Sequence, residues 1–460
     1  MSVLTKLAEF VSSCTYEEIP EDVIQLIREH LLDSIGCTVA ATNEQSIKVL
    51  ERFVRSTPEG TGESTVIGSD KPVSLLGAAL LNGSKADALE MADINKMAGG
   101  HPGGIIVPAA LVVAEYLRST GKELLTALAL GYESQRVSRP LYPHNLQMGM
   151  HVAMLSGTFA SAAATGKLFK FDANTMTNAL GSCSIAPLAP SEPCRCGGYA
   201  KDLYTGWAAR TGVFCALLAK ESFIGTPSLL DGELGVYTCL QADKPAELVA
   251  SKLGEEWITR ATIIKPHAAC RFTHSGADAI LELNPDPDEV EQINITTATL
   301  PYNLTKGPRP EDVVAARFSI PYVVAKALLE KRNLIPRDFT VEAISDQRTL
   351  ALAEKVKCLL DKSLDADWQE PPLGRGMRTS IVEVVLKNGK KLNLRVDYPK
   401  GDSKNPLTWE EITRKFTALT KGFYTEKKAQ QIIHLVEKME FVEDCRVFVN
   451  MLRRDDFSGI

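Results

Sequence analysis

The stretch Ala160-Ser161-Ala162-Ala163-Ala164-Thr165-Gly166-Lys167 carries small side chains on nearly all of its faces. Small side chains allow neighbouring helices to approach closely. We therefore predict a central, buried helix over residues 151–170. Outward from it, segments rich in Ala and Leu predict further helices at 73–92, 105–119, 123–133 and 205–220.

Helical signals also extend towards both ends of the chain. Pro20 suits the start of a helix, and Glu21 and Asp22 follow in a first turn that favours acidic residues. Apolar residues then recur at helical spacing as far as Ile35. Apolar helical faces return between residues 409 and 453.

The chain changes character after about residue 265. Alternation in 293–297 predicts a strand, and Asn388-Gly389 lies between two β-rich runs. Asn-Gly between such runs indicates a hairpin, because both central residues of the turn take positive φ. The runs are 381–386 and 392–396, and helical stretches are expected at 311–332 and 347–362.

These patterns predict a mostly α protein with an α+β second domain. Both chain ends, residues 1–264 and 405–460, would form one all-helical domain. Residues 265–404 would be inserted between them as the smaller α+β domain. A chain of 460 residues is long enough for two such cores.

Composition narrows the classes of partner. The net charge is −6 and there is no basic tract, which argues against nucleic acid as the main partner. The longest apolar stretch, near residues 105–117, is interrupted by Pro108 and Glu115, so no membrane span is expected. The N-terminus does not resemble a signal peptide. Ten scattered cysteines indicate free thiols in a reducing, cytoplasmic setting.

The sequence predicts no cofactor and no metal. Thr165-Gly166-Lys167 falls short of a phosphate loop because Ser161 and Leu168 occupy positions that the motif requires as Gly and Ser or Thr. A zinc site at Cys194-Arg195-Cys196 would need two further ligands at the usual spacing, and the sequence does not offer them. The sequence also has no Cys-x-x-Cys run, which argues against an iron–sulfur cluster. Any dehydration chemistry would therefore depend on side chains alone.

Candidate chemistry begins in a glycine-rich loop that contains Asp93, Lys96 and His101. Histidine changes charge near neutral pH and is the first candidate for proton transfer. A second histidine, His151, directly precedes the small-residue helix, where a helix N-terminus disfavours its cationic form. The alternative for both is a capping or packing role.

Cations gather in two further segments. Lys201 follows a glycine pair, leads into a helix with Tyr204, and can bind a carboxylate. The segment from Lys265 to His274 places four basic groups within ten residues at the expected domain boundary, where small ligands bind. They are Lys265, His267, Arg271 and His274. The alternative is a solvated basic connector.

Tyr322, in Phe318-Ser319-Ile320-Pro321-Tyr322, is either a hydroxyl donor or part of the core.

Together these segments resemble the MmgE/PrpD family in order and spacing. The loop ends in the family's Gly-His-Pro pattern, and the later segments match its Ala-Lys, Cys-Arg-x-x-His and Phe-Ser-x-x-Tyr patterns. The matching residues are Gly100–Gly103, Val107–Leu111, Ala114-Glu115, Gly131–Glu133, His151, Lys201–Gly212, Lys265–His274 and Phe318–Tyr322.

The resemblance implies a helical domain made from both chain ends with an α+β lid, a homodimer and a metal-independent reaction. Known family activities are 2-methylcitrate dehydratase, cis-aconitate decarboxylase and iminodisuccinate epimerase. The implied active-site residues are Asp93, His101, His151, Lys201, Lys265 and Tyr322. His101 is expected to transfer the proton, and Lys201 and Lys265 to neutralise substrate carboxylates. Substrate contacts are expected from Lys96, Tyr204, His267, Arg271 and His274, and also from Arg195.

The chain departs from the family pattern at several positions. Tyr204 stands where a His is common, His267 where a Tyr is usual, and Asn95-Lys96 where the epimerase branch has His-Arg. We expect a lyase, either dehydratase or decarboxylase, that acts on a small di- or tricarboxylic acid. The alternatives are an epimerase of a small amino- or imino-dicarboxylate with the same site, and a non-catalytic carboxylate-binding protein.

Overall fold

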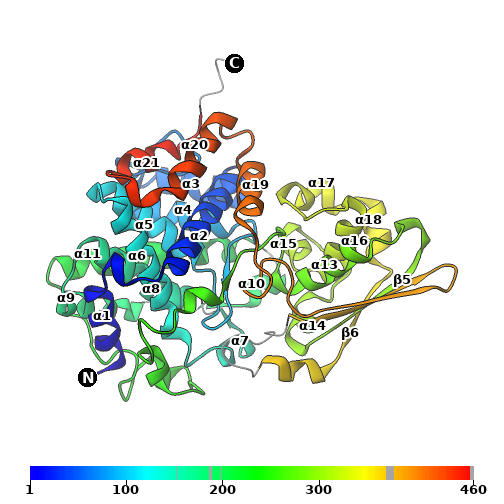
Figure 1. The fold of residues 1–460 in the computed structure, drawn as a ribbon, viewed down its shortest axis with the longest axis horizontal. Coiled ribbons are helices and arrows are strands. Elements are labelled where there is room, and N and C mark those ends of the chain that lie inside the picture. The colour runs from blue at the N-terminus through cyan, green and yellow to red at the C-terminus, as the bar shows by residue number, and fades with distance from the viewer. Residues whose placement is uncertain (152, 186–188, 197, 369–377, 456–460) are drawn as a thin grey trace.

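A helical body and an α+β body make up the chain, side by side in Figure 1. The computed structural model describes residues 1–151, 153–185, 189–196, 198–368 and 378–455. The predicted fold class, mostly α with an α+β second domain, is confirmed. Within these ranges no helix is both long enough and apolar enough to cross a lipid bilayer.

The small-residue stretch lies in α8 (Ala153–Leu168), and Ala160 and Ala162–Ala164 are fully buried. Glycines allow its neighbours to approach closely, because a Cβ at Gly212 of α11 would collide with Ser161. The other predicted helices are also present. They are α4 (Leu75–Asp87), α5 (Gly103–Leu117), α6 (Gly121–Ser134) and α11 (Tyr204–Lys220).

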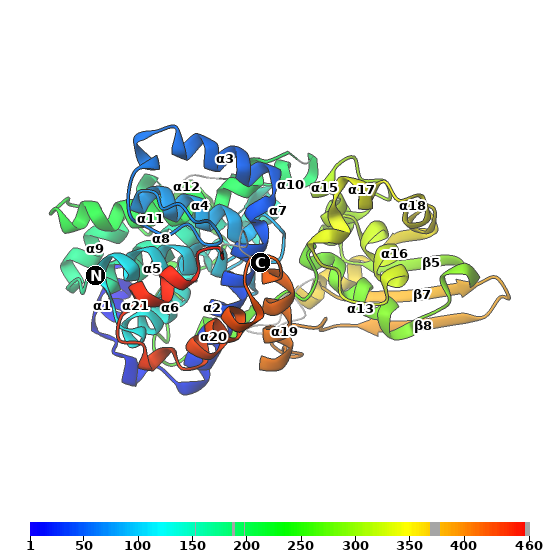
Figure 2. The ribbon, with the colours of Figure 1, turned by 90° about the horizontal axis from the view of Figure 1, so that it is seen from above.

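Helices from the two chain ends share one apolar core. That core runs from Val3 to Leu452 and includes Phe416 and Ile432. α2 (Glu21–Ala40) packs against α19 (Trp409–Thr420), as Figure 2 also shows, and α21 (Cys445–Met451) packs against α5. Further helices of this body are α1 (Val3–Ser13), α3 (Gln45–Arg55), α7 (His144–Gln147), α9 (Ala173–Gly181), α10 (Glu192–Cys196), α12 (Val236–Cys239) and α20 (Glu426–Glu437), while α14 (Thr299–Thr305) and α17 (Val341–Ile344) belong to the α+β body.

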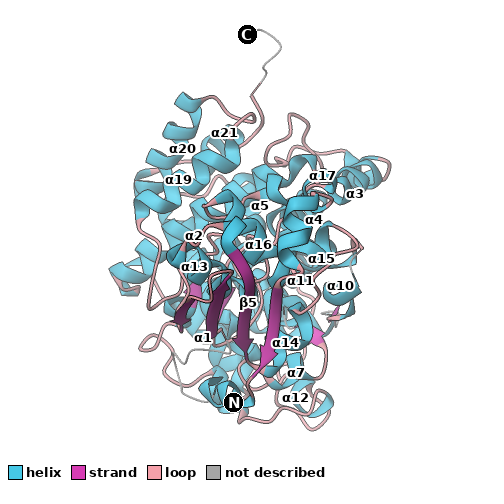
Figure 3. Ribbon diagram, turned by 90° about the vertical axis from the view of Figure 1, so that its right-hand side faces the viewer, coloured by secondary structure: helices cyan, strands magenta, loops and turns pink. Residues whose placement is uncertain are grey.

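A four-stranded sheet in the order β6-β5-β7-β8 organises the α+β body (Figure 3). β5 pairs in parallel with β6 and antiparallel with β7, and Gly389 takes a φ of +80° in the predicted β7–β8 hairpin. Helices α13 (His274–Leu283), α16 (Ile320–Glu330) and α18 (Gln347–Ala353) share an apolar core with the sheet. The strands are β5 (Val290–Thr297), β6 (Val356–Leu360), β7 (Ser380–Leu386) and β8 (Lys391–Val396).

Two predicted helices are interrupted in the structure. The expected helix over 347–362 was wrong in its second half, because β6 pairs with β5 there. The expected helix over 311–332 divides into α15 (Val313–Arg317) and α16, since Ser319 caps the start of α16 and Pro321 follows it. Both breaks depend on pairing or capping that overrides helical periodicity.

Two short strand pairs anchor the loops that carry candidate residues. β1 (Ile94–Asn95) pairs with β4 (Thr262–Ile263), which connects the glycine-rich loop to the segment before Lys265. β2 (Met150–His151) pairs with β3 (Ala189–Pro190) directly before α8. Each pair holds segments that are far apart in sequence next to one another.

Candidate active site

A cavity of about 740 Å³, which includes its opening to solvent, lies where the two bodies meet. The helical body contributes acidic and basic groups, and the α+β body contributes arginines and an apolar wall. The residues that line the cavity are Glu90, Ile94, Gly99, Gly100, His101, Tyr142, His151, Ser191, Cys194, Lys201, Lys265, Cys270, Arg271, Phe272, Leu304, Phe318 and Arg378. Clefts between domains are common ligand sites.

Lys201 is held by two carboxylates at the end of α4. Its Nζ lies 2.8 Å from Asp87 Oδ2 and also contacts Glu90 Oε1. Although burial alone would lower the pKa of Lys201, Asp87 and Glu90 raise it well above its usual value. Lys201 is therefore a permanently charged, fixed ammonium group.

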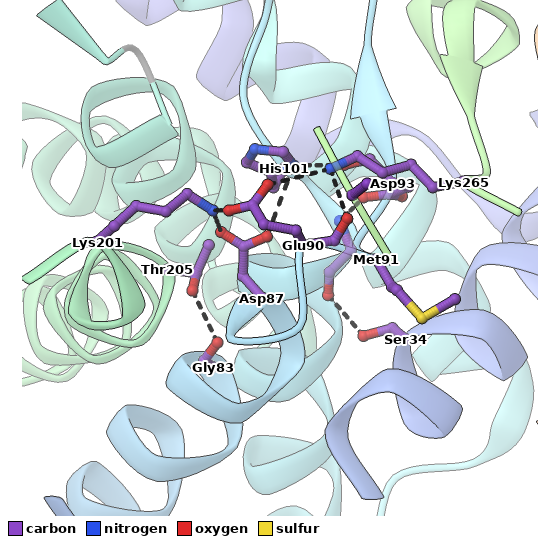
Figure 4. Close-up of polar contacts among 12 residues, drawn as sticks. Ser34, Gly83, Asp87, Glu90, Met91, Asp93, His101, Lys201, Thr205 and Lys265 are labelled. Carbon is purple, nitrogen blue, oxygen red and sulfur yellow. Dashed lines mark hydrogen bonds and ion pairs between the residues drawn. The ribbon is translucent and has the colours of Figure 1, made fainter. Parts of the chain in front are cut away.

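Lys265 approaches Glu90 from the opposite side, as Figure 4 shows. Its Nζ donates to the backbone oxygen of Glu90 at 2.9 Å and lies 3.5 Å from Glu90 Oε2. Burial would raise the pKa of Glu90, but Lys201 and Lys265 together lower it below its usual range. Glu90 has a φ of +55°, an uncommon conformation for a residue other than glycine, and such strain often accompanies function.

His101 lies beside this charged cluster with one ring nitrogen engaged. Its Nδ1 is 2.9 Å from the backbone oxygen of Asp93. We assign the proton to Nδ1 because a carbonyl can only accept, and this leaves the lone pair of Nε2 for chemistry. Burial lowers the pKa of His101 below 6.5, an effect that Lys265 and Lys201 strengthen and Asp87 opposes.

His151 stacks on His101. Their ring centroids are 5.7 Å apart and the ring planes differ by 22°. Burial lowers the pKa of His151 well below its usual value, and His101 and Lys201 lower it further. The cavity therefore presents two neutral imidazoles beside two charged lysines.

Asp93 lies behind the loop, and the structure does not bring its carboxylate to the described cavity lining. Oδ1 accepts from the backbone N–H of Gly103 at 2.7 Å, and Oδ2 accepts from the Tyr132 hydroxyl at 2.8 Å. His30 Nδ1 is 2.9 Å from the same Oδ2. Asp93 therefore supports the loop and, through its carbonyl, orients His101.

The hydroxyls of the two tyrosines expected at the site, Tyr322 and Tyr204, bond to backbone oxygens outside the described cavity lining. Tyr322 lies in the core of the α+β body, and its hydroxyl donates to the backbone oxygen of Asp338 at 2.8 Å. The Tyr204 hydroxyl donates to the backbone oxygen of Pro190 at 2.8 Å, and its ring lies 5.8 Å from that of His151. Among the described residues, neither tyrosine lines the cavity.

His267 and His274 form a buried structural pair with ring centroids 4.9 Å apart. His267 lies 3.1 Å from Asp278 Oδ1 and accepts from the backbone N–H of Leu334 at 3.1 Å. His274 lies 3.1 Å from both Arg271 and the backbone oxygen of Ala269. These partners hold both histidines at the domain junction. Arg271 is the basic residue of their segment that joins Lys265 at the described cavity lining.

Asn95 and the side chain of Lys96 are also buried within the loop. The Asn95 amide donates to Ile258 and Thr262, and its oxygen accepts from Met97 and Ala98. Lys96 pairs with Asp402 at 2.9 Å. The departure at Asn95 is therefore explained by loop structure, and Ile94, its neighbour, faces the cavity.

Sequence reasoning missed Asp87, Glu90, Tyr142 and Arg378. The first two lie within the Ala- and Leu-rich segment 73–92, which the sequence predicts as an ordinary core helix; in the structure Asp87 ends α4 and Glu90 lies just after it. One available signal was chemical: a lysine placed in a buried site needs a carboxylate partner, and acids close to the loop were the candidates.

Cys194 and Cys270 line the cavity as buried cysteines. Burial raises the pKa of Cys194 to about 12 and that of Cys270 to about 11. They form a small apolar cluster with Phe318, which contributes the apolar wall. The side chains of Arg195 and Cys196 lie outside the described residues.

Comparison with known proteins agrees with this architecture. Residues 5–249 match the MmgE/PrpD N-terminal domain and residues 267–440 match the MmgE/PrpD C-terminal domain. The chain belongs to the MmgE/PrpD family. It is 26% identical to cis-aconitate decarboxylase of Aspergillus terreus, over 98% of this chain and 96% of the relative.

Other relatives include cis-aconitate decarboxylase of Mus musculus, 25% identical over 98% of this chain and 93% of the relative. The mitochondrial 2-methylcitrate dehydratase of Yarrowia lipolytica is 26% identical over 51% of this chain and 46% of the relative. Decarboxylases and dehydratases of this kind are lyases, and the chain is an enzyme of the MmgE/PrpD lyase type.

Proposed function

We propose that this chain is a metal-independent lyase that acts on a small di- or tricarboxylic acid, with decarboxylation as the first candidate reaction. The observation that carries the proposal is His101, whose Nδ1 is engaged and whose ring lines a cavity beside Lys201 and Lys265. Decarboxylation is placed before dehydration because the relatives matched over nearly their whole length are named decarboxylases.

The two lyase reactions would use the same proton transfer in opposite directions. In decarboxylation the C–C bond to one carboxylate breaks, its electrons stay on the carbon as CO₂ leaves, and His101, after it has taken up a proton on Nε2, donates that proton there. In dehydration neutral His101 takes the proton next to a carboxylate, and the hydroxyl leaves as water with a proton from a cavity acid. The fixed positive charge of Lys201 and Lys265 would stabilise the carbanion in both cases.

Metal independence is supported by the ion pairs that the two carboxylates, Asp87 and Glu90, already form. Asp87 and Glu90 already share ammonium groups with Lys201 and Lys265, at the positions where a cation would bind. The lysines would perform the electrostatic work that a metal ion performs in other enzymes. Activity is therefore expected to be the same with and without a chelator.

An epimerase would require two proton-transfer groups on opposite faces of one carbon. His101 and His151 do not offer this arrangement, because their rings stack with centroids 5.7 Å apart and planes differing by 22°. Their nitrogens exchange protons in these nearly parallel ring planes, so the two groups do not point at each other across one carbon. The histidine pair therefore supports one-sided proton transfer and places the epimerase second.

The test is a proton NMR assay in heavy water with cis-aconitate, methylcitrate, citrate and iminodisuccinate. His101→Gln is the inactive variant, and His434→Gln is the matched control, because His434 is exposed on α20. Loss of a carboxylate, or a new vinyl signal, in the control but not in His101→Gln supports the lyase. Deuterium exchange without a new carbon skeleton supports the epimerase. Binding of these acids without any turnover supports a non-catalytic protein.

We also propose a homodimer. An apolar stripe along α11 and the turn before it remains exposed, and it consists of Tyr199, Leu203, Trp207 and Phe214. A stripe of this kind is typical of a protein contact surface. Light scattering tests the proposal: the protein should have twice the chain mass and Trp207→Asp should halve it, whereas a monomeric wild-type protein would contradict it.

A further inference from the structure

A second group of cations with buried side chains lies where the glycine-rich loop meets the α+β body. Lys96 pairs with Asp402 Oδ1 at 2.9 Å, and Arg271 approaches Asp402 Oδ2 at 3.9 Å. Arg378 lies close enough to lower the pKa of Lys96, with burial as the main cause. Arg271 and Arg378 both line the cavity and are each 2% exposed.

The two groups differ in charge balance. In the first, Lys201 and Lys265 are equalled in number by Asp87 and Glu90, so that the group as a whole is neutral while both lysines still line the cavity. In the second, the cations outnumber the carboxylates. Lys96, Arg271 and Arg378 face Asp402, and the next carboxylate, Asp278, is engaged with His267 and the backbone N–H of Lys400.

An excess of buried positive charge is costly unless an anion compensates it. Burial, opposed by Asp402 and assisted by Arg378, lowers the pKa of Arg271 to about 10. The same cations lower the pKa of Asp402 against the effect of its burial. The protein therefore maintains an unmatched positive charge at the cavity wall.

Arg378 has more unused donors than Arg271. The terminal nitrogens of Arg271 are engaged with the backbone oxygens of Pro399 and Lys400 and with His274. Arg378 hydrogen-bonds the Tyr142 hydroxyl. Within the described residues, the buried Nε of each arginine has no partner. A planar guanidinium with free donors matches the two oxygens of a carboxylate.

We propose that Arg378 is the carboxylate-binding residue of a second subsite, with Arg271 as the positive charge behind it. His101 and the lysines act at the reacting carbon, while Arg378 holds a carboxylate remote from that carbon. The chain therefore selects substrates with at least two carboxylates. This inference rests on the proposed function, because the remote carboxylate is defined relative to the carbon at His101.

The test is calorimetric binding of tricarballylate, which carries three carboxylates and has neither a hydroxyl to eliminate nor a double bond. The purified full chain and its Arg378→Gln and Arg378→Lys variants are compared. Loss of charge-assisted hydrogen bonds should weaken binding by roughly 10- to 100-fold in Arg378→Gln. Arg378→Lys should lie in between because it retains the charge and loses the planar fork.

Arg348→Gln is the matched control, since Arg348 lies exposed on α18 of the same body and loses the same charge. Its affinity for tricarballylate should equal that of the wild type. Butyrate, with one carboxylate, should bind weakly and equally to all variants. Thermal unfolding confirms that each variant is folded, and Arg378→Lys carries the test if the glutamine variant is not.

The outcomes separate the inference from the proposed function. Tight binding of tricarballylate that Arg378→Gln and Arg378→Lys leave unchanged would overturn the subsite and leave the lyase proposal intact. Failure of the wild type to bind tricarballylate, together with turnover in the NMR assay, would likewise overturn only the subsite. Failure in both assays would overturn both.

Discussion

Replacing Glu90 by glutamine removes one negative charge from the buried lysine cluster and nearly preserves the shape of the side chain. The carboxylate is 5% exposed and contacts Lys201 and Lys265, which leaves the cluster with one unmatched positive charge in the variant. Breaking a buried ion pair costs about 3–5 kcal/mol. Because the glutamine oxygen still accepts from one lysine, we expect a loss near the lower end of that range, about 3 kcal/mol.

The assay is urea denaturation at pH 7, where the wild-type carboxylate is ionised because its pKa is lowered from 4.5. This contribution to stability is present above pH 4.5 and is lost as the pH falls through the lowered pKa of the folded state. Glu282→Gln is the matched control, because Glu282 is exposed on α13 and should lose no more than about 0.5 kcal/mol. A loss below about 1 kcal/mol in Glu90→Gln would refute the charge balance described for the cluster.

Three further expectations concern the reaction and the packing. The pKa of His101 lies below 6.5. If protonated His101 donates in decarboxylation, kcat/KM should fall roughly tenfold for each pH unit above that pKa. A kcat/KM that instead rises with pH through the same pKa would indicate dehydration. Tyr322→Phe should keep wild-type kcat in the NMR assay and lose about 1 kcal/mol of stability with its bond to Asp338, and a large loss of kcat would return the tyrosine to the site. Gly206→Ala should lose about 1–3 kcal/mol in thermal unfolding because its Cβ collides with a carbonyl of α4, while Gly307→Ala, which meets open space, should unfold like the wild type.

Much of the fold was predictable because its signals are local. Small residues around Ala160 indicated a closely packed helix, and Asn388-Gly389 indicated the hairpin in which Gly389 takes positive φ. The strand β6 was not predictable in this way. Val356–Leu360 becomes a strand because β5 offers a parallel partner, and that pairing joins segments about sixty residues apart.

The candidate site was predictable at His101, His151, Lys201, Lys265 and Arg271, which line the cavity. These residues combine titratable or charged groups with turn-like or boundary sequence, and such positions favour binding. The carboxylates that pair with the two lysines, Asp87 and Glu90, could not be predicted. Residue type alone does not show which charged side chains meet in the fold.

The sequence by itself determined the helical and β-rich segments, and the family pattern that carries the histidines and lysines. Only the tertiary structure determined that Glu90 contacts the two lysines and that Asp93, three residues later in the same loop, does not line the described cavity. The left-handed conformation at Glu90 and the bonds from Gly103 and Tyr132 to Asp93 direct one carboxylate to the lysines and the other behind His101. The same holds for Arg378, whose role depends on charges gathered from distant segments, since electrostatic balance is a property of three-dimensional proximity.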